Sequence, residues 1–127
     1  MTYVARDDAP SFCYTTGIFR TFSIPEIFIS SLPPNLSHEL VTQYVARFSH
    51  STPPVNVRIG AAKERFDYFL VPVLPNRLQN FVLASYQFYN DEPFDCLQLI
   101  YPDTSLRFPH EDGYDYDQEI LGEYASE

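Results

Sequence analysis

The most regular pattern of the chain lies between residues 34 and 48. Apolar residues recur there every three or four positions and polar residues fall between them, which predicts an amphipathic helix packed against a core. Pro33-Pro34 marks the start, because proline suits the first helical position and the residue before a proline is extended. Glu39 near the start and Arg47 near the end agree with the helix dipole. The expected buried positions are Leu36, Leu40, Val41, Tyr44, Val45 and Phe48.

Five other stretches predict β-strands, because they are short and rich in β-branched and aromatic residues. Gly17, within the first of them, suggests a bulge or a close backbone approach. Pro72, within the fourth, indicates an edge strand or a bulge. The first two stretches are close enough to pair antiparallel, and the third and fourth form a plausible hairpin. The stretches are residues 11–19, 27–31, 55–59, 66–74 and 96–101.

Residues 75–90 fit a helical face through Leu78, Val82, Tyr86 and Tyr89, although a strand is also compatible with the pattern. We favour the helix here, and a short helix over 118–124. No repeat, linker or low-complexity tract divides the chain, and 127 residues suffice for one core. We therefore expect a single α+β domain over residues 1–127, with a largely antiparallel sheet and one or two helices packed on one face.

Charge is distributed very unevenly along this chain. Residues 91–127 hold eleven acidic residues and a single base, Arg107, so this acidic C-terminal segment carries −10. Residues 1–90 carry +1, and the whole chain carries −9. An acidic segment can simply keep a protein soluble. Here tyrosines interleave with the carboxylates, a combination suited to an interface with a cationic partner.

The same charge argues against other partners. A sequence pI near 4.6 and a single lysine, Lys63, do not suit binding to nucleic-acid phosphates or to an anionic membrane surface. The N-terminus has no signal-peptide pattern and no apolar run is long enough to span a bilayer, so we expect a cytoplasmic protein. Cys13 and Cys96 are expected to be buried thiols, while their distance in space stays open.

Four stretches together resemble a known family. They are PSFCYTTGIF (residues 10–19), FSIPEIFISSLPPNLSHELV (22–41), LQLIYPD (97–103) and RFPHEDGY (107–114). The chain resembles the bacterial family described as domain of unknown function 4262, with Tyr101 where the family often has Trp and a looser match over residues 49–90. The resemblance implies a small soluble bacterial protein and carries no agreed activity, so no catalytic role follows from it.

No phosphate-binding loop, dinucleotide-binding turn, nucleophile elbow or CxxC pair occurs in the sequence. The three histidines are scattered, and the carboxylates after His110 match no calcium loop, so we expect no metal and no cofactor. One polar constellation accompanies the predicted core strands, and buried polar groups need partners. It is either a cleft or a set of hydrogen bonds that fix turns, and we favour the second. Its members are Tyr14, Thr15, Thr16, Glu26, Gln98 and Asp103.

The functional expectation is therefore a small acidic binding protein. In its strongest form it is an immunity protein that neutralises a toxin with a cationic active site, because an acidic, tyrosine-bearing segment can occupy such a cleft. The alternatives are a small enzyme using Tyr14, Glu26, Gln98 and Asp103, and a homo-oligomeric scaffold; the oligomeric state stays open. The expected partner-binding residues are Glu111, Asp112, Tyr114, Asp115, Tyr116 and Asp117.

Overall fold

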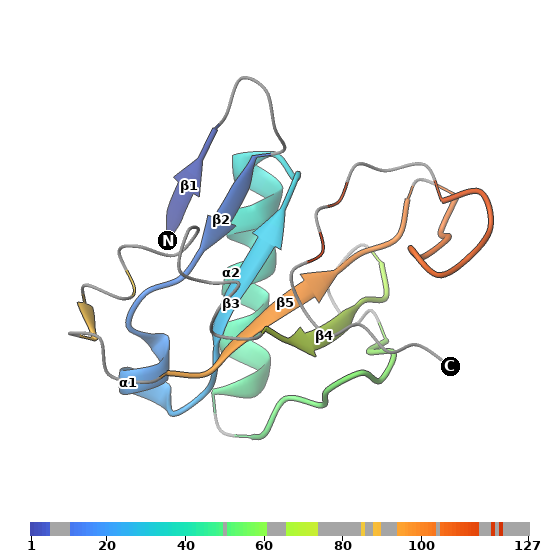
Figure 1. Cartoon of the computed structure of the whole chain (residues 1–127). Helices are drawn as coiled ribbons and strands as arrows, with labels where there is room; N and C mark the ends of the chain where they lie inside the picture. The colour runs from blue at the N-terminus through green and yellow to red at the C-terminus, as the bar shows by residue number, and fades with distance from the viewer. Residues whose placement is uncertain are drawn as a thin grey trace.

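The fold is a five-stranded sheet with one long helix across a face, as shown in Figure 1. The computed structural model describes residues 1–5, 11–49, 51–60, 66–73, 85, 88–89, 94–103, 105–114, 118 and 120. In chain order the elements are β1 (Thr2–Val4), β2 (Phe12–Tyr14), α1 (Ile18–Phe22), β3 (Glu26–Ser30), α2 (Pro34–Phe48), β4 (Phe69–Pro72) and β5 (Cys96–Ile100).

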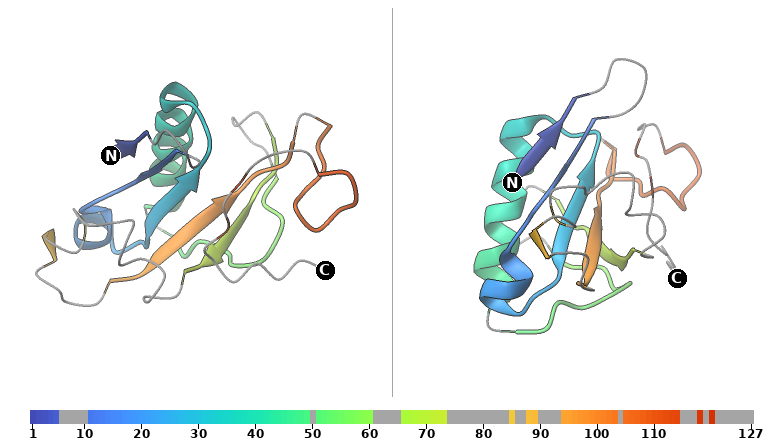
Figure 2. Two further views of the ribbon diagram at one scale, coloured as in Figure 1. Left: turned by 45° about the horizontal axis from the view of Figure 1, so that its top comes forward. Right: turned by 60° about the vertical axis from the view of Figure 1, so that its left-hand side comes forward.

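The strands lie in the order β1-β2-β3-β5-β4. Among the strands that the structure describes, β3 and β5 run parallel, with Glu26 opposite Cys96, and the other three pairings are antiparallel. The views in Figure 2 show α2 lying against one face of this sheet. The expected α+β fold with a largely antiparallel sheet is therefore confirmed.

Both faces of the central strands are buried. Every residue of β3 and β5 is inaccessible to solvent, as is usual for parallel strands that are covered on both sides. On the helix side, Ile27 and Leu97 pack with Leu40 and Tyr44 of α2. On the other side, two smaller clusters form around Phe28 and around the fully buried Phe108. Phe108 thus ties the C-terminal segment to the back of the sheet.

Helix α2 begins where the two prolines predict. Pro33 is extended, with φ −61° and ψ 154°, and Pro34 is the first helical residue. Arg47 lies in the last turn as expected, but no acidic residue lies in the first turn, so Glu39 does not support the N-terminus. Of the expected apolar positions, Leu36 and Val45 are only half-buried.

The strand predicted over residues 11–19 is wrong in its second half. Strand β2 ends at Tyr14, and Gly17 then takes a φ of +105° and begins the short helix α1 instead of forming a bulge. This left-handed conformation suits glycine. It turns the backbone N–H groups of Gly17 and Phe19 toward the Glu26 carboxylate. The hydrogen bonds from Gly17 and Phe19 to Glu26, which lies nine and seven positions further along the chain, therefore override the local strand preference.

The predicted strand over 55–59 is also wrong for most of its length. Asn56 has a φ of +57°, and only Ile59 forms a bridge, with Tyr68. The N–H of Asn56 also donates to the carbonyl of Leu70 at 2.9 Å. The two stretches of the expected hairpin therefore do lie side by side, but they are joined by isolated hydrogen bonds and not as two regular strands. Pro72 does lie in an edge strand, as predicted. Edge strand β1 had no counterpart among the predicted strands.

Two further predictions fall mainly outside the described residues. Within the helix expected over 75–90, the structure describes Ser85, Phe88 and Tyr89, and the Tyr89 N–H donates to the Ser85 carbonyl at 3.0 Å, as in a helical turn. Within the helix expected over 118–124, it describes Gln118 and Ile120, neither in regular structure.

Leu40 provides a direct test of the core. Its side chain is 3% exposed between α2 and the sheet, so Leu40→Ala should lower the free energy of unfolding by about 2–5 kcal/mol. The exposed Thr42, two positions on, gives the matched control, and Thr42→Ala should change it by less than about 0.5 kcal/mol. Urea titrations of both variants measure this, and equal small effects would contradict the packing of α2.

Candidate functional site

Glu26, the first residue of β3, is a buried carboxylate surrounded by donors. Its side chain is 1% exposed. The Gly17 and Phe19 N–H groups donate to Oε2 at 2.8 and 3.1 Å, and the Thr15 hydroxyl donates to Oε1 at 2.7 Å. The Tyr89 hydroxyl also donates to Oε2. The carboxylate is therefore compensated by four hydrogen bonds rather than presented to a ligand.

Neighbouring hydroxyl groups extend this network. Thr15 Oγ1 accepts the Ile27 N–H at 2.9 Å, and the Ser85 hydroxyl donates to the Thr15 carbonyl at 2.8 Å. The hydroxyls of Thr16 and Ser85 are 2.7 Å apart. The network thus joins the end of β2, the start of β3 and the segment that carries Ser85 and Tyr89, which lies about seventy residues further along the chain.

Tyr89 belongs to this hydrogen-bond network, although the sequence did not place it in the polar constellation. Its ring stacks on Phe94 with centroids 4.9 Å apart, and its oxygen accepts the Arg20 N–H at 3.2 Å. Burial, and then the hydrogen bond to Glu26, raise the pKa of Tyr89 to about 12. Its hydroxyl therefore stays protonated and donating at neutral pH. The periodicity of residues 75–90 placed Tyr89 on a helical face but could not reveal a partner 63 positions away.

Asp103 belongs to a different part of the molecule. It follows the carboxyl end of β5, whereas Glu26 lies opposite Cys96 at the amino end of that strand. Its Oδ1 accepts the N–H groups of Ser105 and Arg107 at 2.9 and 3.0 Å, and Arg107 Nε lies 3.5 Å from Oδ2. This is the arrangement of a carboxylate that fixes a turn.

The remaining members of the expected constellation are buried in the sheet. Gln98 lies in the middle of β5, opposite Phe28 and Val71, and is 0% exposed. Tyr14 packs with Phe12 and Phe28 on the sheet face away from α2. The structure thus brings Thr15, Thr16 and Glu26 together but does not bring Tyr14, Gln98 and Asp103 to the same point.

The described part of the acidic segment that follows β5, seen in Figure 1 as the orange-red loop, is anchored at several points. Phe108 is fully buried, and its N–H donates to Glu111 Oε1 at 2.9 Å. Tyr114 is half-buried and donates its hydroxyl to the Tyr101 carbonyl at 3.2 Å. The Gln118 side-chain amide pairs with both backbone groups of Tyr101, at 3.0 and 3.3 Å.

The expected partner-binding residues therefore differ in what they offer. Glu111 and Asp112 are exposed, although Glu111 also caps the Phe108 N–H, and Tyr114 uses its hydroxyl inside the fold. Asp115, Tyr116 and Asp117 lie outside the described residues. Of the two described carboxylates in this set, Asp112 therefore has less structural duty than Glu111.

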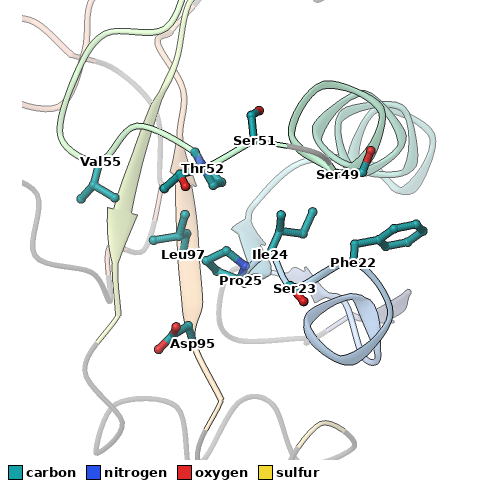
Figure 3. A pocket seen from close by; sticks show the side chains of 11 residues that line it. Phe22, Ser23, Ile24, Pro25, Ser49, Ser51, Thr52, Val55, Asp95 and Leu97 are labelled. Carbon is teal, nitrogen blue, oxygen red and sulfur yellow. The ribbon is translucent and has the colours of Figure 1, made fainter.

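A hollow of about 500 Å³ lies on the α2 side of the sheet, and no sequence motif predicted it. Figure 3 shows it between the end of α2, the loop that follows, and the amino ends of β3 and β5. Its volume is in the range of small-ligand sites. The described residues that line it are Phe22, Ser23, Ile24, Pro25, Ser49, Ser51, Thr52, Pro53, Val55, Asp95 and Leu97.

Both cysteines are free and buried. Cys13 packs with the α2 cluster and Cys96 with the cluster on the opposite face. Strand β3 also separates their strands, so the two do not form a disulfide. Burial raises the pKa of both thiols, which opposes formation of a reactive thiolate at neutral pH.

The structure defines a single-domain α+β protein whose best-connected polar centre is Glu26. The chain belongs to the family described as domain of unknown function (DUF4262), whose model matches residues 1–115. No curated protein and no solved structure matches it. The match leaves out only part of the acidic segment, residues 116–127.

Among the residues that the structure describes, no three His, Cys, Asp or Glu side chains converge as metal ligands would. No helix in that part of the chain combines the length and apolar character that crossing a bilayer requires.

Asp103→Ala should lower the free energy of unfolding by about 1–3 kcal/mol. The reason is that Asp103, which is 4% exposed, accepts hydrogen bonds from two backbone N–H groups that would lose their acceptor. Asp103→Asn keeps an oxygen acceptor and should cost less than the alanine variant. Thermal melts of both rank them. An unchanged or raised midpoint for Asp103→Ala would count against a turn-fixing role and in favour of a functional carboxylate.

The raised pKa of Tyr89 predicts an alkaline loss of stability. The group ionises at about pH 10 when unfolded and about pH 12 when folded, so above pH 10 the unfolded state releases its proton first and unfolding becomes easier as pH rises. Its contribution is fully present below pH 10 and is lost between those values. Tyr89→Phe should therefore show a shallower decline in stability than the native chain in denaturant melts from pH 9 to 12, and parallel curves would contradict this.

Proposed function

We propose that this protein binds a cationic protein partner through its acidic segment, residues 91–127. The observation that carries the proposal is the charge of −10 in this segment against +1 in the rest of the chain. The exposed carboxylates Glu111 and Asp112 support it, because they stand on a loop where a partner can reach them. Charge of one sign gathered on one part of the surface accelerates the encounter with an oppositely charged partner.

The anchoring of the loop adds a second line of support. Buried Phe108, the turn at Asp103 and the pairing of Gln118 with Tyr101 hold the described residues 103, 105–114 and 118 at separate points. A binding loop that is ordered before the encounter loses less conformational entropy in the complex. The described part of the acidic segment is thus better suited to recognition than an unattached acidic tail would be.

In its most specific form, the proposal is a bacterial immunity protein that neutralises a toxin with a cationic active site. Small size and an acidic surface suit that role. The enzyme alternative has less support, since none of Tyr14, Glu26, Gln98 and Asp103 is among the described residues that line the hollow beside α2, and Glu26 is engaged by four donors. Cytoplasmic location belongs to the same proposal.

Affinity capture tests the proposal. The tagged native chain is exposed to extract of the source cells at low ionic strength. A variant in which Asp112, Asp115 and Asp117 are replaced by Asn is treated in the same way. We expect a basic protein to be retained by the native chain, released by salt and lost from the variant. Equal retention by both chains, or retention of acidic proteins only, would contradict it.

A further inference from the structure

The residues that line the hollow beside α2 suit a ligand that carries a positive charge at the end of an apolar chain. Its walls include Phe22, Ile24 and Leu97, while Asp95 supplies a carboxylate and Ser23, Ser49, Ser51 and Thr52 supply hydroxyl groups. None of the described residues that line it is basic. An anionic ligand would therefore meet a carboxylate without a compensating charge, whereas a cation would be attracted.

Two helix ends add to the negative potential. Helix α2 ends at Phe48 with Ser49 as its C-cap, and α1 ends at Phe22 with Ser23 as its C-cap. Both caps line the hollow, as Figure 3 shows. The last carbonyl groups of a helix carry partial negative charge and favour a nearby cation.

The carboxylate is available for a new partner. Asp95 is exposed, and in the part of the chain that the structure describes no side chain donates a hydrogen bond to it. Its backbone carbonyl accepts the Glu26 N–H at 2.8 Å, which fixes the position of the residue beside β3. Phe22 and Val55 remain 39% and 42% exposed at the hollow, so apolar surface is also left to cover.

We propose that this hollow binds the arginine side chain of a basic protein partner, with the guanidinium near Asp95, at one end of the hollow, and the aliphatic stem against Leu97 and Ile24. A guanidinium is planar, stays charged and offers five donors, which matches a carboxylate at the end of an apolar wall better than a compact ammonium does. The identity of the carrier rests on the proposed function, whereas the site rests on its own geometry.

The test uses the whole protein and small blocked amino acids. Nα-acetyl-arginine methylamide is titrated into isotopically labelled protein, and the citrulline counterpart serves as the neutral control of the same shape. We expect saturable shifts of the resonances of Ile24, Val55 and Leu97 with arginine, and binding at least about tenfold weaker with citrulline. Equal responses to the two compounds would overturn the proposal.

Two variants of matched charge locate the site. Asp95→Asn should weaken arginine binding about five- to tenfold, whereas Asp112→Asn on the acidic loop should leave it unchanged. Ser51→Lys, at the exposed edge of the hollow, should abolish binding by placing a cation there. Shifts centred on residues 110–114, or a larger effect of Asp112→Asn than of Asp95→Asn, would reject the hollow as the site.

Three further outcomes separate the hypotheses. Tighter binding of free arginine than of the blocked form would indicate a metabolite rather than a protein side chain and would overturn the proposal. Loss of arginine binding in Asp95→Asn without loss of partner capture would show that the partner does not use the hollow and would overturn this proposal, while leaving the acidic-segment function standing. Partner capture that fails while arginine still binds in the hollow would instead reject the acidic-segment function alone.

Discussion

Glu26→Ala should lower the free energy of unfolding by about 3–5 kcal/mol or more, the largest effect we expect of any single substitution. The change removes a carboxylate that is 1% exposed and accepts hydrogen bonds from Thr15, Gly17, Phe19 and Tyr89. Each donor left without an acceptor in a buried place costs about 1–3 kcal/mol. Urea titration followed by circular dichroism measures the loss.

Two controls separate the network from a general effect of removing charge. Glu26→Gln retains one carbonyl oxygen and should cost less than the alanine variant, because part of the donor set keeps an acceptor. Asp112→Ala removes an exposed carboxylate and should change stability by less than about 0.5 kcal/mol. Unchanged or increased stability of Glu26→Ala would contradict the structural role and indicate a strained functional site.

Helix α2 shows which parts of the fold could be predicted. Its apolar spacing, the two prolines at its start and Arg47 near its end are local features, and each has its expected place. The edge position of β4 followed from Pro72 for the same reason. Local signals sufficed where the backbone conformation depends on neighbours in the sequence.

The region after Tyr14 shows why the rest could not be predicted. Residues 15–19 have strand-forming side chains, yet the Glu26 carboxylate and the left-handed Gly17 favour a turn and helix α1. Likewise Tyr89 reaches Glu26 across 63 positions, and the hollow gathers residues from 22 to 97. A site assembled from such distant contacts leaves no pattern of spacing in the sequence.

Replacing Asp112, Asp115 and Asp117 by Asn should slow association with the partner by about tenfold or more. Exposed charges at an interface act mainly on the encounter rate, and the three changes remove three of the eleven carboxylates of the acidic segment. The dissociation rate should change by less than about threefold. Surface plasmon resonance against the captured partner gives both rates.

Substitutions of the aromatic residues of the segment should change mainly the dissociation rate and not the association rate. Tyr116→Ala should speed dissociation, because packed aromatic side chains hold a complex once it has formed. Tyr114→Phe is more informative than Tyr114→Ala, since the Tyr114 hydroxyl donates to the Tyr101 carbonyl and truncation of the ring would disturb the fold.

The most direct test of the central claim is the salt dependence of the association rate for the native chain and the triple Asn variant. Raising ionic strength from about 0.05 M to about 0.5 M shortens the screening length well below the spacing of surface charges. We expect the native rate to fall by about tenfold or more and the variant rate to fall by much less. An association rate that does not change with salt, and is equal in both chains, would contradict partner binding through the acidic segment.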